Sequence, residues 1–204
     1  MTQSASKEGC CNGVRYYRTR HSAIRQLKHR HTPDTYGYRV WTSCWLLMEY
    51  LKGLRLPHGL RVMEIGCGWG LASIYCAKQL QASATCVDVD PEVFPFLLAH
   101  AELNQVRVTT LNCDYEDLTA EDLAGIDLLI GADICFWEEM PVALGDLIDR
   151  ALAAGVGLIL IADPGRSTFD QLAAWAQARH GGATNRFYTR QPHPIGGRIL
   201  RIGH

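Results

Sequence analysis

Apolar and polar residues follow one another along this chain in blocks that predict strands and helices in turn. After residue 35, short apolar runs alternate with longer segments whose apolar residues recur at helical spacing. The expected strands are 61–65, 84–88, 106–111, 127–132 and 156–162, and the expected helices are 41–53, 70–80, 91–104, 139–152 and 167–179. Two further expected strands, 184–190 and 197–203, flank a segment rich in Pro and Gly, which favours an antiparallel hairpin.

Strands this apolar, each followed by a helix, favour a mostly parallel sheet that is covered by helices on both faces. We therefore predict an α/β fold with a doubly wound, seven-stranded sheet that ends in the C-terminal antiparallel hairpin. The sequence has 204 residues, enough for one such domain with its own core. We assign residues 36–204 to this domain and residues 1–35 to a basic, helical N-terminal extension.

Charge is distributed unevenly along the chain. Residues 1–31 carry seven Lys or Arg and one Glu, whereas residues 114–149 carry eleven Asp or Glu and no Lys or Arg. A basic arm can bind nucleic acid, but this one contains no recognisable nucleic-acid module. We therefore expect an amphipathic segment packed over the domain and no nucleic-acid partner. The acidic stretch fits either solvated helix faces or a surface that attracts a basic partner.

Composition also bears on location and on metal binding. Residues 1–30 are too polar for a signal peptide, and the longest apolar run, 151–162, is too short to cross a bilayer. The eight cysteines include no Cys-x-x-Cys pair and no cluster with His at metal-ligand spacing. We therefore expect reduced thiols, no metal site, no membrane partner and a cytoplasmic location.

The segment that carries most chemical information is Glu-Ile-Gly-Cys-Gly-Trp-Gly at 64–70, between an expected strand and an expected helix. Gly66, Gly68 and Gly70 allow a tight turn and let a ligand approach the backbone closely. N–H groups at the start of the next helix attract an anionic group such as a carboxylate. A dinucleotide site would need Gly-x-Gly-x-x-Gly, but residue 71 is Leu. A turn with a purely structural role is the alternative.

This E-x-G-x-G-x-G pattern resembles motif I of the class I methyltransferases, which have a Rossmann-like fold and bind S-adenosyl-L-methionine (SAM). The resemblance implies SAM as the cofactor and S-adenosyl-L-homocysteine as its product. It also implies that Glu64, Gly66, Gly68 and Gly70 contribute to the cofactor site.

Ligands of such folds lie at the carboxyl ends of the strands, so the residues that close each strand are candidates. Asp88 comes 18 residues after the last motif glycine, close to the spacing at which a carboxylate accepts hydrogen bonds from ribose hydroxyls. Asp90 is the alternative, although its place before a proline favours a helix cap. By resemblance, Asp114 would accept from the adenine amino group and Tyr115 would flank the ring, unless Asp114 only forms a turn.

The fourth expected strand is followed by Asp133 and then by Phe136 and Trp137. A carboxylate and two aromatic rings would place polar and π surfaces where the methyl donor is expected. We assign to Asp133 contact with the cofactor and the holding of an incoming amine, and to Phe136 and Trp137 cation–π contact with the substrate or the sulfonium. Both rings could instead be plain core or rim residues. The polar run 163–166 lies at the same edge and could be a plain turn.

Further segments resemble the family-16 seven-strand methyltransferases, which include protein-lysine methyltransferases acting on electron-transfer flavoprotein β, calmodulin and a valosin-containing ATPase. Residues 37–41 read Gly-x-x-x-Trp, residues 133–136 read Asp-Ile-Cys-Phe where the family has Tyr last, and residues 163–166 read Asp-Pro-Gly-Arg. The resemblance covers about residues 36–170. It implies a cofactor contact for Trp41 and N-methylation of a protein lysine. The alternatives are methylation of a small amine or other metabolite, and a non-catalytic SAM-binding module.

Overall fold

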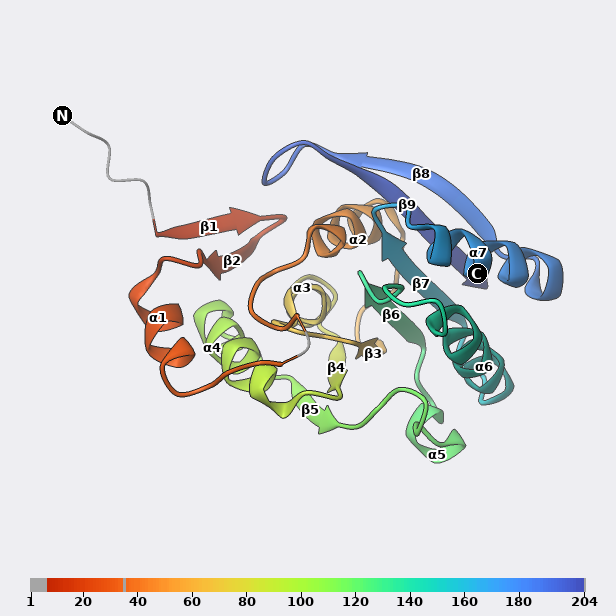
Figure 1. Ribbon diagram of the computed structural model, residues 1–204, viewed down its shortest axis with the longest axis horizontal. Helices are drawn as coiled ribbons and strands as arrows, with labels where there is room; N and C mark the ends of the chain where they lie inside the picture. The colour runs from red at the N-terminus through yellow and green to blue at the C-terminus, as the bar shows by residue number, and fades with distance from the viewer. Residues whose placement is uncertain (1–6, 35, 204) are drawn as a thin grey trace.

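The computed structural model describes residues 7–34 and 36–203, and it is built around a seven-stranded sheet with the order β5-β4-β3-β6-β7-β9-β8 (Figure 1). The first five strands of this order run parallel, and β9 pairs antiparallel with both β7 and β8. The strands are β3 (Arg61–Ile65), β4 (Ser83–Asp88), β5 (Thr109–Asn112), β6 (Leu128–Ala132), β7 (Leu158–Asp163), β8 (Ala183–Thr189) and β9 (Ile195–Gly203). The predicted fold class is confirmed, including the C-terminal antiparallel hairpin.

Helices cover both faces of this sheet. Figure 1 shows α2 and α3 on one side of β6 and β7, and α6 and α7 on the other. The helices of the domain are α2 (Thr42–Gly53), α3 (Leu71–Gln79), α4 (Phe94–Asn104), α5 (Ala120–Leu123), α6 (Met140–Ala153) and α7 (Ser167–His180), with a 3-10 turn, η1 (Pro91–Val93), before α4. The expected helix at 91–104 is thus divided in two, and the short α5 was not predicted.

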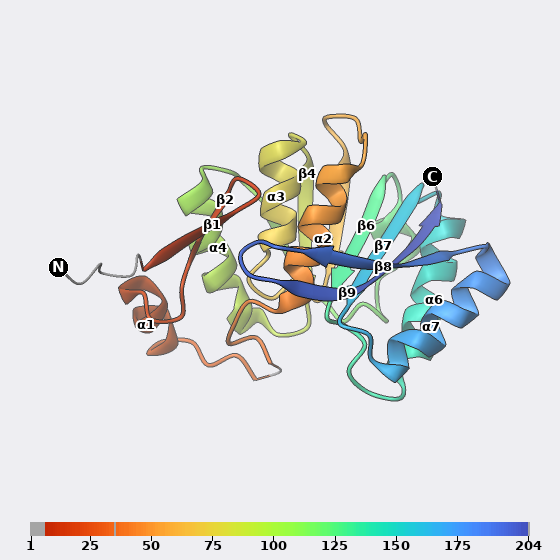
Figure 2. The same cartoon turned by 90° about the horizontal axis from the view of Figure 1, so that it is seen from above.

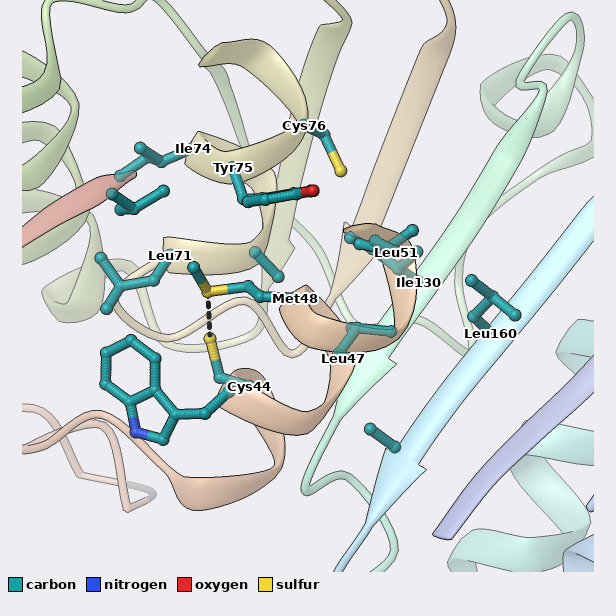
Figure 3. Packing of buried hydrophobic residues seen from close by; sticks show 14 of the residues in the cluster. Cys44, Leu47, Met48, Leu51, Leu71, Ile74, Tyr75, Cys76, Ile130 and Leu160 are labelled. Carbon is teal, nitrogen blue, oxygen red and sulfur yellow. Dashed lines mark hydrogen bonds between the residues drawn. The ribbon is translucent and has the colours of Figure 1, made fainter. Parts of the chain in front are cut away.

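Alternate residues of the central strands enter two separate cores. In β6, Leu128 and Ile130 pack with α2 and α3, whereas Leu129 packs with α6 and α7. Figure 3 shows the first of these cores, where the Cys44 Sγ lies 3.8 Å from the Met48 Sδ. Because both faces of the strand are buried, its sequence is a continuous apolar run rather than an alternating one.

The N-terminal region forms a hairpin and a short helix. Strands β1 (Glu8–Cys11) and β2 (Val14–Tyr17) pair antiparallel, and α1 (Ser22–Lys28) follows. The helix agrees with the expected helical extension, but the hairpin was not predicted. Cys11 and Val14 are buried in the same core as α2 and α3, so the hairpin packs on the domain. The domain boundary at residue 35 stays a prediction, and residue 35 itself lies outside the described residues.

Two side chains of α4 hold the backbone of β2. The Asn104 Oδ1 accepts from the Arg15 N–H at 2.9 Å, and the Asn104 Nδ2 donates to the Arg15 carbonyl at 2.7 Å. The His100 Nε2 accepts from the Tyr17 N–H at 3.2 Å, and the His100 Nδ1 lies 2.6 Å from the Phe96 carbonyl. This pairing requires neutral imidazole, and burial lowers the pKa of His100 accordingly. None of the helices among the described residues is both long enough and apolar enough to cross a bilayer.

Replacement of Asn104 should loosen the N-terminal hairpin. Asn104→Ala leaves a backbone donor and a backbone acceptor of Arg15 without their partner, so we expect a loss of about 1–3 kcal/mol in the free energy of unfolding. Urea unfolding measures this loss, and hydrogen exchange of residues 8–17 should become faster. Gln177→Ala, at an exposed position of α7, is the matched control and should change neither quantity. Unchanged exchange in Asn104→Ala would contradict the docking role.

Candidate active site

A cavity of about 290 Å³ opens at the carboxyl ends of the parallel strands. Its place follows from the strand order, because β3 pairs with β4 on one side and with β6 on the other, and the chain crosses the sheet between them. Most of the residues predicted for a site line this cavity: Trp41, Gly66, Gly68, Asp88, Asp114, Tyr115, Asp133, Phe136 and Trp137. Residues from four strand ends and from the segment before α2 are thereby brought together.

The two remaining predicted residues, Glu64 and Gly70, line a neighbouring small cavity of about 40 Å³. This cavity shares Trp41, Gly66 and Gly68 with the larger one. The Glu64 Oε2 accepts from the Ser73 N–H in the first turn of α3, at 2.9 Å. Burial raises the pKa of Glu64 from 4.5 to about 7. A buried carboxyl group thus lies beside the glycine turn.

The glycine turn leaves one position open toward a ligand. Gly66, Gly68 and Gly70 all have positive φ angles, of 59°, 51° and 65°. A Cβ at Gly66 would meet the Ile134 side chain, and a Cβ at Gly70 would meet Leu97. A Cβ at Gly68 would meet no protein atom within 4 Å. The backbone at Gly68 is therefore the part of the turn that a bound group can approach.

The carboxyl group at the end of β4 is fixed by the same turn. The Asp88 Oδ2 accepts from the Gly68 N–H at 2.8 Å, and the Asp88 Oδ1 accepts from the Asp90 N–H at 3.1 Å. Burial raises the pKa of Asp88. The Asp90 Oδ1 instead accepts from the Glu92 N–H and caps η1, as its place before proline suggested. Asp88 lines the cavity and Asp90 does not.

The segment after β5 contributes Asp114 and Tyr115 to the lining of the cavity. The Asp114 Oδ1 accepts from the Glu116 N–H at 3.0 Å, so this residue does form the turn that was the alternative to a ligand contact. Its position on the cavity wall is compatible with both roles. Burial raises the pKa of the Tyr115 hydroxyl above its usual range.

Asp133, at the end of β6, belongs to a charge cluster that links β6, β7 and α2. Its side chain is buried, the Oδ2 accepts from the Ser43 N–H at 2.7 Å, and the Oδ1 accepts from the Arg166 Nη1 at 3.0 Å. The same Arg166 Nη1 donates to the Asp163 Oδ2 at 2.7 Å. The Arg166 guanidinium also lies 4.1 Å from the centre of the Phe136 ring. One cation therefore holds two buried carboxylates and contacts one of the two predicted aromatic residues.

Sequence reasoning did not assign a site role to Arg166. Its Asp-Pro-Gly-Arg run was noted as a polar cluster and as part of the family resemblance, but spacing could not reveal a partner 33 residues away. The run is more than a plain turn, because Asp163 is fully buried and its Oδ1 accepts from the Gly165 and Arg166 N–H groups, both at 2.7 Å.

Aromatic rings surround the entrance of the cavity. The Tyr36 and Phe136 rings stack with centroids 5.2 Å apart, and the Trp41 ring meets Phe136 edge-on at 5.3 Å. The Trp137 ring lies 6.2 Å from both Tyr36 and Phe136 and is 42% exposed. Phe136 is thus half-buried among its neighbours, whereas Trp137 is a rim residue with exposed surface.

Comparison with known proteins agrees with this geometry. Residues 62–155 match the family model described as a methyltransferase domain. The matched region is a methyltransferase domain. Similar folds include precorrin-6y C5,15-methyltransferase from Geobacter metallireducens GS-15, with a TM-score of 0.62 and 14% identity over 85% of this chain and 94% of that one. M. capricolum TrmK in complex with S-adenosyl-homocysteine has a TM-score of 0.53 and 11% identity, covering 80% and 68% of the two chains.

Curated relatives of this methyltransferase domain include protein-lysine enzymes. The electron transfer flavoprotein beta subunit lysine methyltransferase of Danio rerio is 28% identical over 142 residues, which are 68% of this chain and 53% of the relative. Protein N-lysine methyltransferase METTL21A of Danio rerio is 32% identical over 130 residues, 60% of this chain and 58% of the relative. The chain thus spans about half the length of the curated relatives it matches.

Removal of the Arg166 guanidinium, which bridges Asp133 and Asp163, should destabilise the folded protein. Arg166→Gln leaves Asp133 and Asp163 close together without their shared guanidinium, so we expect a loss of about 3 kcal/mol or more in the free energy of unfolding. Urea unfolding measures it. Arg107→Gln, at an exposed position for which the described chain shows no ion pair, is the control and should have no effect. Equal stability of wild type and Arg166→Gln would show that the cluster is not structural.

Glu64 should make stability depend on pH. Its folded-state pKa of about 7 lies above the unfolded value, so the native state binds a proton that the unfolded state has lost, and stability falls as pH rises from 4.5 toward 7. Glu64→Gln keeps an acceptor for the Ser73 N–H but cannot bind this proton. The free energy of unfolding of this variant should therefore fall less between pH 4.5 and pH 7 than that of the wild type. Denaturant unfolding across the window measures both slopes. Glu102→Gln, exposed on α4, should keep the wild-type slope, and a wild-type slope in Glu64→Gln would contradict the assignment.

Proposed function

We propose that this protein is a SAM-dependent N-methyltransferase that methylates a lysine side chain of a protein. The observation that carries the proposal is the cavity at the β3–β6 switch point, where the open backbone at Gly68, a strand-end carboxylate and an aromatic entrance lie together. The matched methyltransferase family and the protein-lysine relatives support the chemistry and the substrate class.

The donor set on the cavity wall fits the parts of SAM. Asp88 would accept hydrogen bonds from the ribose hydroxyls, and Asp114 and Tyr115 would contact the adenine. The open backbone at Gly68 would face the carboxylate end of the cofactor. When bound, SAM supplies an electrophilic methyl group on a sulfonium.

Glu64 and Trp41 complete the proposed cofactor site. Both line the small cavity next to the glycine turn, and the buried Glu64 carboxyl forms no ion pair with a Lys or Arg of the described chain. A buried carboxylate needs a cation to offset its desolvation. We propose that the amino group of SAM is that cation, with Trp41 as the adjoining wall.

Asp133 is proposed to hold the acceptor amine. A carboxylate can accept about four hydrogen bonds, and those from Ser43 and Arg166 use one site on each oxygen. A further donor can therefore be accepted from the cavity side. Arg166 keeps Asp133 in place, so that the amine is aligned rather than merely attracted, which is the main requirement of an in-line displacement.

The aromatic entrance is proposed to receive the lysine side chain. Trp137 and Tyr36 are both about two-fifths exposed, so their rings can contact the side chain and its cation. Cation–π contact contributes roughly 0.5–2 kcal/mol. Partial desolvation there lowers the pKa of the lysine ammonium from about 10.4, which helps it to lose its proton before attack. Phe136, already in contact with Arg166, would act from the inner side of the same entrance.

A cytoplasmic location is also proposed. All eight cysteines are unpaired, and most of them are buried, as expected for reduced thiols in a reducing compartment.

The experiment that tests the function is incubation of the protein with methyl-labelled SAM and a cell lysate. Label in a protein band that yields methyl-lysine on hydrolysis is the expected result. Label in a small molecule would identify the alternative, a methyltransferase of a small amine or metabolite. SAM binding without transfer to any lysate component would identify a non-catalytic module.

SAM should bind in preference to NAD, and Asp88 should matter for its affinity. Asp88→Ala removes charge-assisted hydrogen bonds to the ribose and should weaken SAM binding by about 1.5–3 kcal/mol, as measured by calorimetry. Asp90→Ala is the matched control and should keep the affinity, because Asp90 lies outside the cavity. Loss in the Asp90 variant alone would show that Asp90 and not Asp88 binds the ribose, and binding of NAD without SAM would overturn the proposed function.

Asp133→Asn should separate catalysis from cofactor binding. The change keeps the size of the side chain but removes its charge, so SAM affinity should stay nearly intact while turnover falls by about 10²-fold or more. Calorimetry and the labelled-SAM assay measure the two quantities, and a melting curve checks that the variant is folded. Full turnover in the folded variant would refute the role of Asp133.

A further inference from the structure

A second groove, of about 670 Å³, opens beside the proposed active site. Its polar wall is formed by Lys7, Arg18, Arg20, Arg39 and His193, and we call it the basic groove. Among the described residues, no Asp or Glu lines it. The groove therefore concentrates positive charge on a protein whose net charge is −1.

The basic groove is built by three parts of the chain that are distant in sequence. The N-terminal hairpin supplies one wall, the segment before α2 a second, and the turn between β8 and β9 the third. Figure 2 shows this last turn extending from the sheet toward the hairpin. The floor of the basic groove includes Trp45 and Trp69, which are buried. The docking of β2 by Asn104 and His100 thus also shapes the groove.

Only a short segment separates the basic groove from the proposed active site. The small cavity beside the glycine turn shares Arg39 and Val40 with the groove, and it shares Trp41 and Gly66 with the larger cavity. A polypeptide lying in the groove could therefore pass over residues 39–41 and reach the aromatic entrance. The Arg39 guanidinium lies 4.0 Å from the centre of the Trp41 ring, on that path.

The cations of the basic groove are not neutralised within the described chain. Lys7, Arg18, Arg20 and Arg39 are exposed, and none of them forms an ion pair with a carboxylate of the described residues. The Arg18 Nε donates to a backbone carbonyl, that of Glu8, at 3.4 Å. Uncompensated charges that converge on one groove favour an anionic partner and raise its association rate.

The aromatic rings of the groove favour a peptide over single-stranded nucleic acid. Trp69 already stacks on Phe96 and His100, with both centroids 5.3 Å away, and Tyr17 stacks on His21 at 4.2 Å. Proteins that bind single-stranded nucleic acid use free ring faces to stack the bases. Here those faces are used for internal packing, and positive charge remains as the recognition element.

The far side of the proposed active site has the opposite charge. Glu116 and Glu139 line that side of the cavity and are exposed, and no basic residue lines the cavity among the described residues. The acceptor entrance therefore lies between a positive groove and a negative wall.

We infer that the basic groove binds an acidic segment of the protein substrate and so presents a nearby lysine to the active site. This inference rests on the proposed function and adds to it the kind of sequence that is recognised. The acidic residues of the substrate would occupy the groove, while Glu116 and Glu139 would favour the side of the substrate that carries the acceptor lysine.

The test is direct binding of a fluorescein-labelled hexaglutamate peptide to the full chain, followed by fluorescence anisotropy at low salt. We expect binding that weakens as salt is added, and a loss of about tenfold or more in Arg18→Glu/Arg20→Glu. The matched control is Arg25→Glu/Arg30→Glu, which makes the same charge change at exposed positions outside the groove. This control should keep affinity within about threefold of the wild type. Melting curves check that both variants are folded.

Three results would overturn the inference: no hexaglutamate binding, equal loss in the two double variants, or tighter binding of a labelled hexauridylate that is lost in the groove variant. Calorimetry with SAM on the same samples separates this inference from the proposed function. Wild type that binds SAM but not hexaglutamate overturns the groove alone. Wild type that binds hexaglutamate but not SAM overturns the proposed function instead.

Discussion

The parallel pairing of β3 with β4 on one side and β6 on the other determines where every part of the proposed active site lies. The connection after β3 and the connection after β6 run toward opposite edges of the sheet, so a cavity remains between the ends of these two strands. The glycine turn after β3, Asp88 at the end of β4 and Asp133 after β6 reach that cavity only because the strands are in register. Both faces of β3 and β6 are buried, which fixes this register, since a shift by one residue would turn core side chains to the wrong face.

The side of the proposed active site that would receive the acceptor depends on a second interaction, the Arg166 bridge between Asp133 and Asp163. Two carboxylates buried at neighbouring strand ends would repel each other. The Arg166 guanidinium pairs with both, offsets this repulsion and links β6 to β7. The Ser43 N–H joins the start of α2 to the same link. Asp133 also has a left-handed backbone, with φ of 61°, a conformation that costs energy for a residue other than glycine. The surrounding hydrogen bonds hold it there.

Much of the fold could be predicted from the sequence because its elements have strong periodic patterns. The strand at 61–65 was predicted with its observed ends, since an apolar run stops abruptly at glycine there. The N-terminal hairpin was missed because each strand has four residues and little alternation, although Asn12-Gly13 at its turn is a typical hairpin signal. The glycine motif, the strand-end residues and the family resemblance together predicted nine residues that line one cavity. Arg166 was not found, because its importance comes from contacts across the sheet that no local spacing encodes.

The buried Glu64 carboxyl has a thermodynamic consequence for cofactor binding. With a pKa of about 7, Glu64 carries a proton in a large fraction of molecules near neutral pH. Under its proposed role, the ammonium of SAM pairs with the ionised form, so each binding event displaces part of a proton into the buffer. The measured heat of binding would then vary with the ionisation enthalpy of the buffer, and SAM affinity would rise with pH up to the point where Glu64 is already ionised. Proton release thus becomes a signature of the cofactor reaching the glycine turn, independent of any methyl transfer.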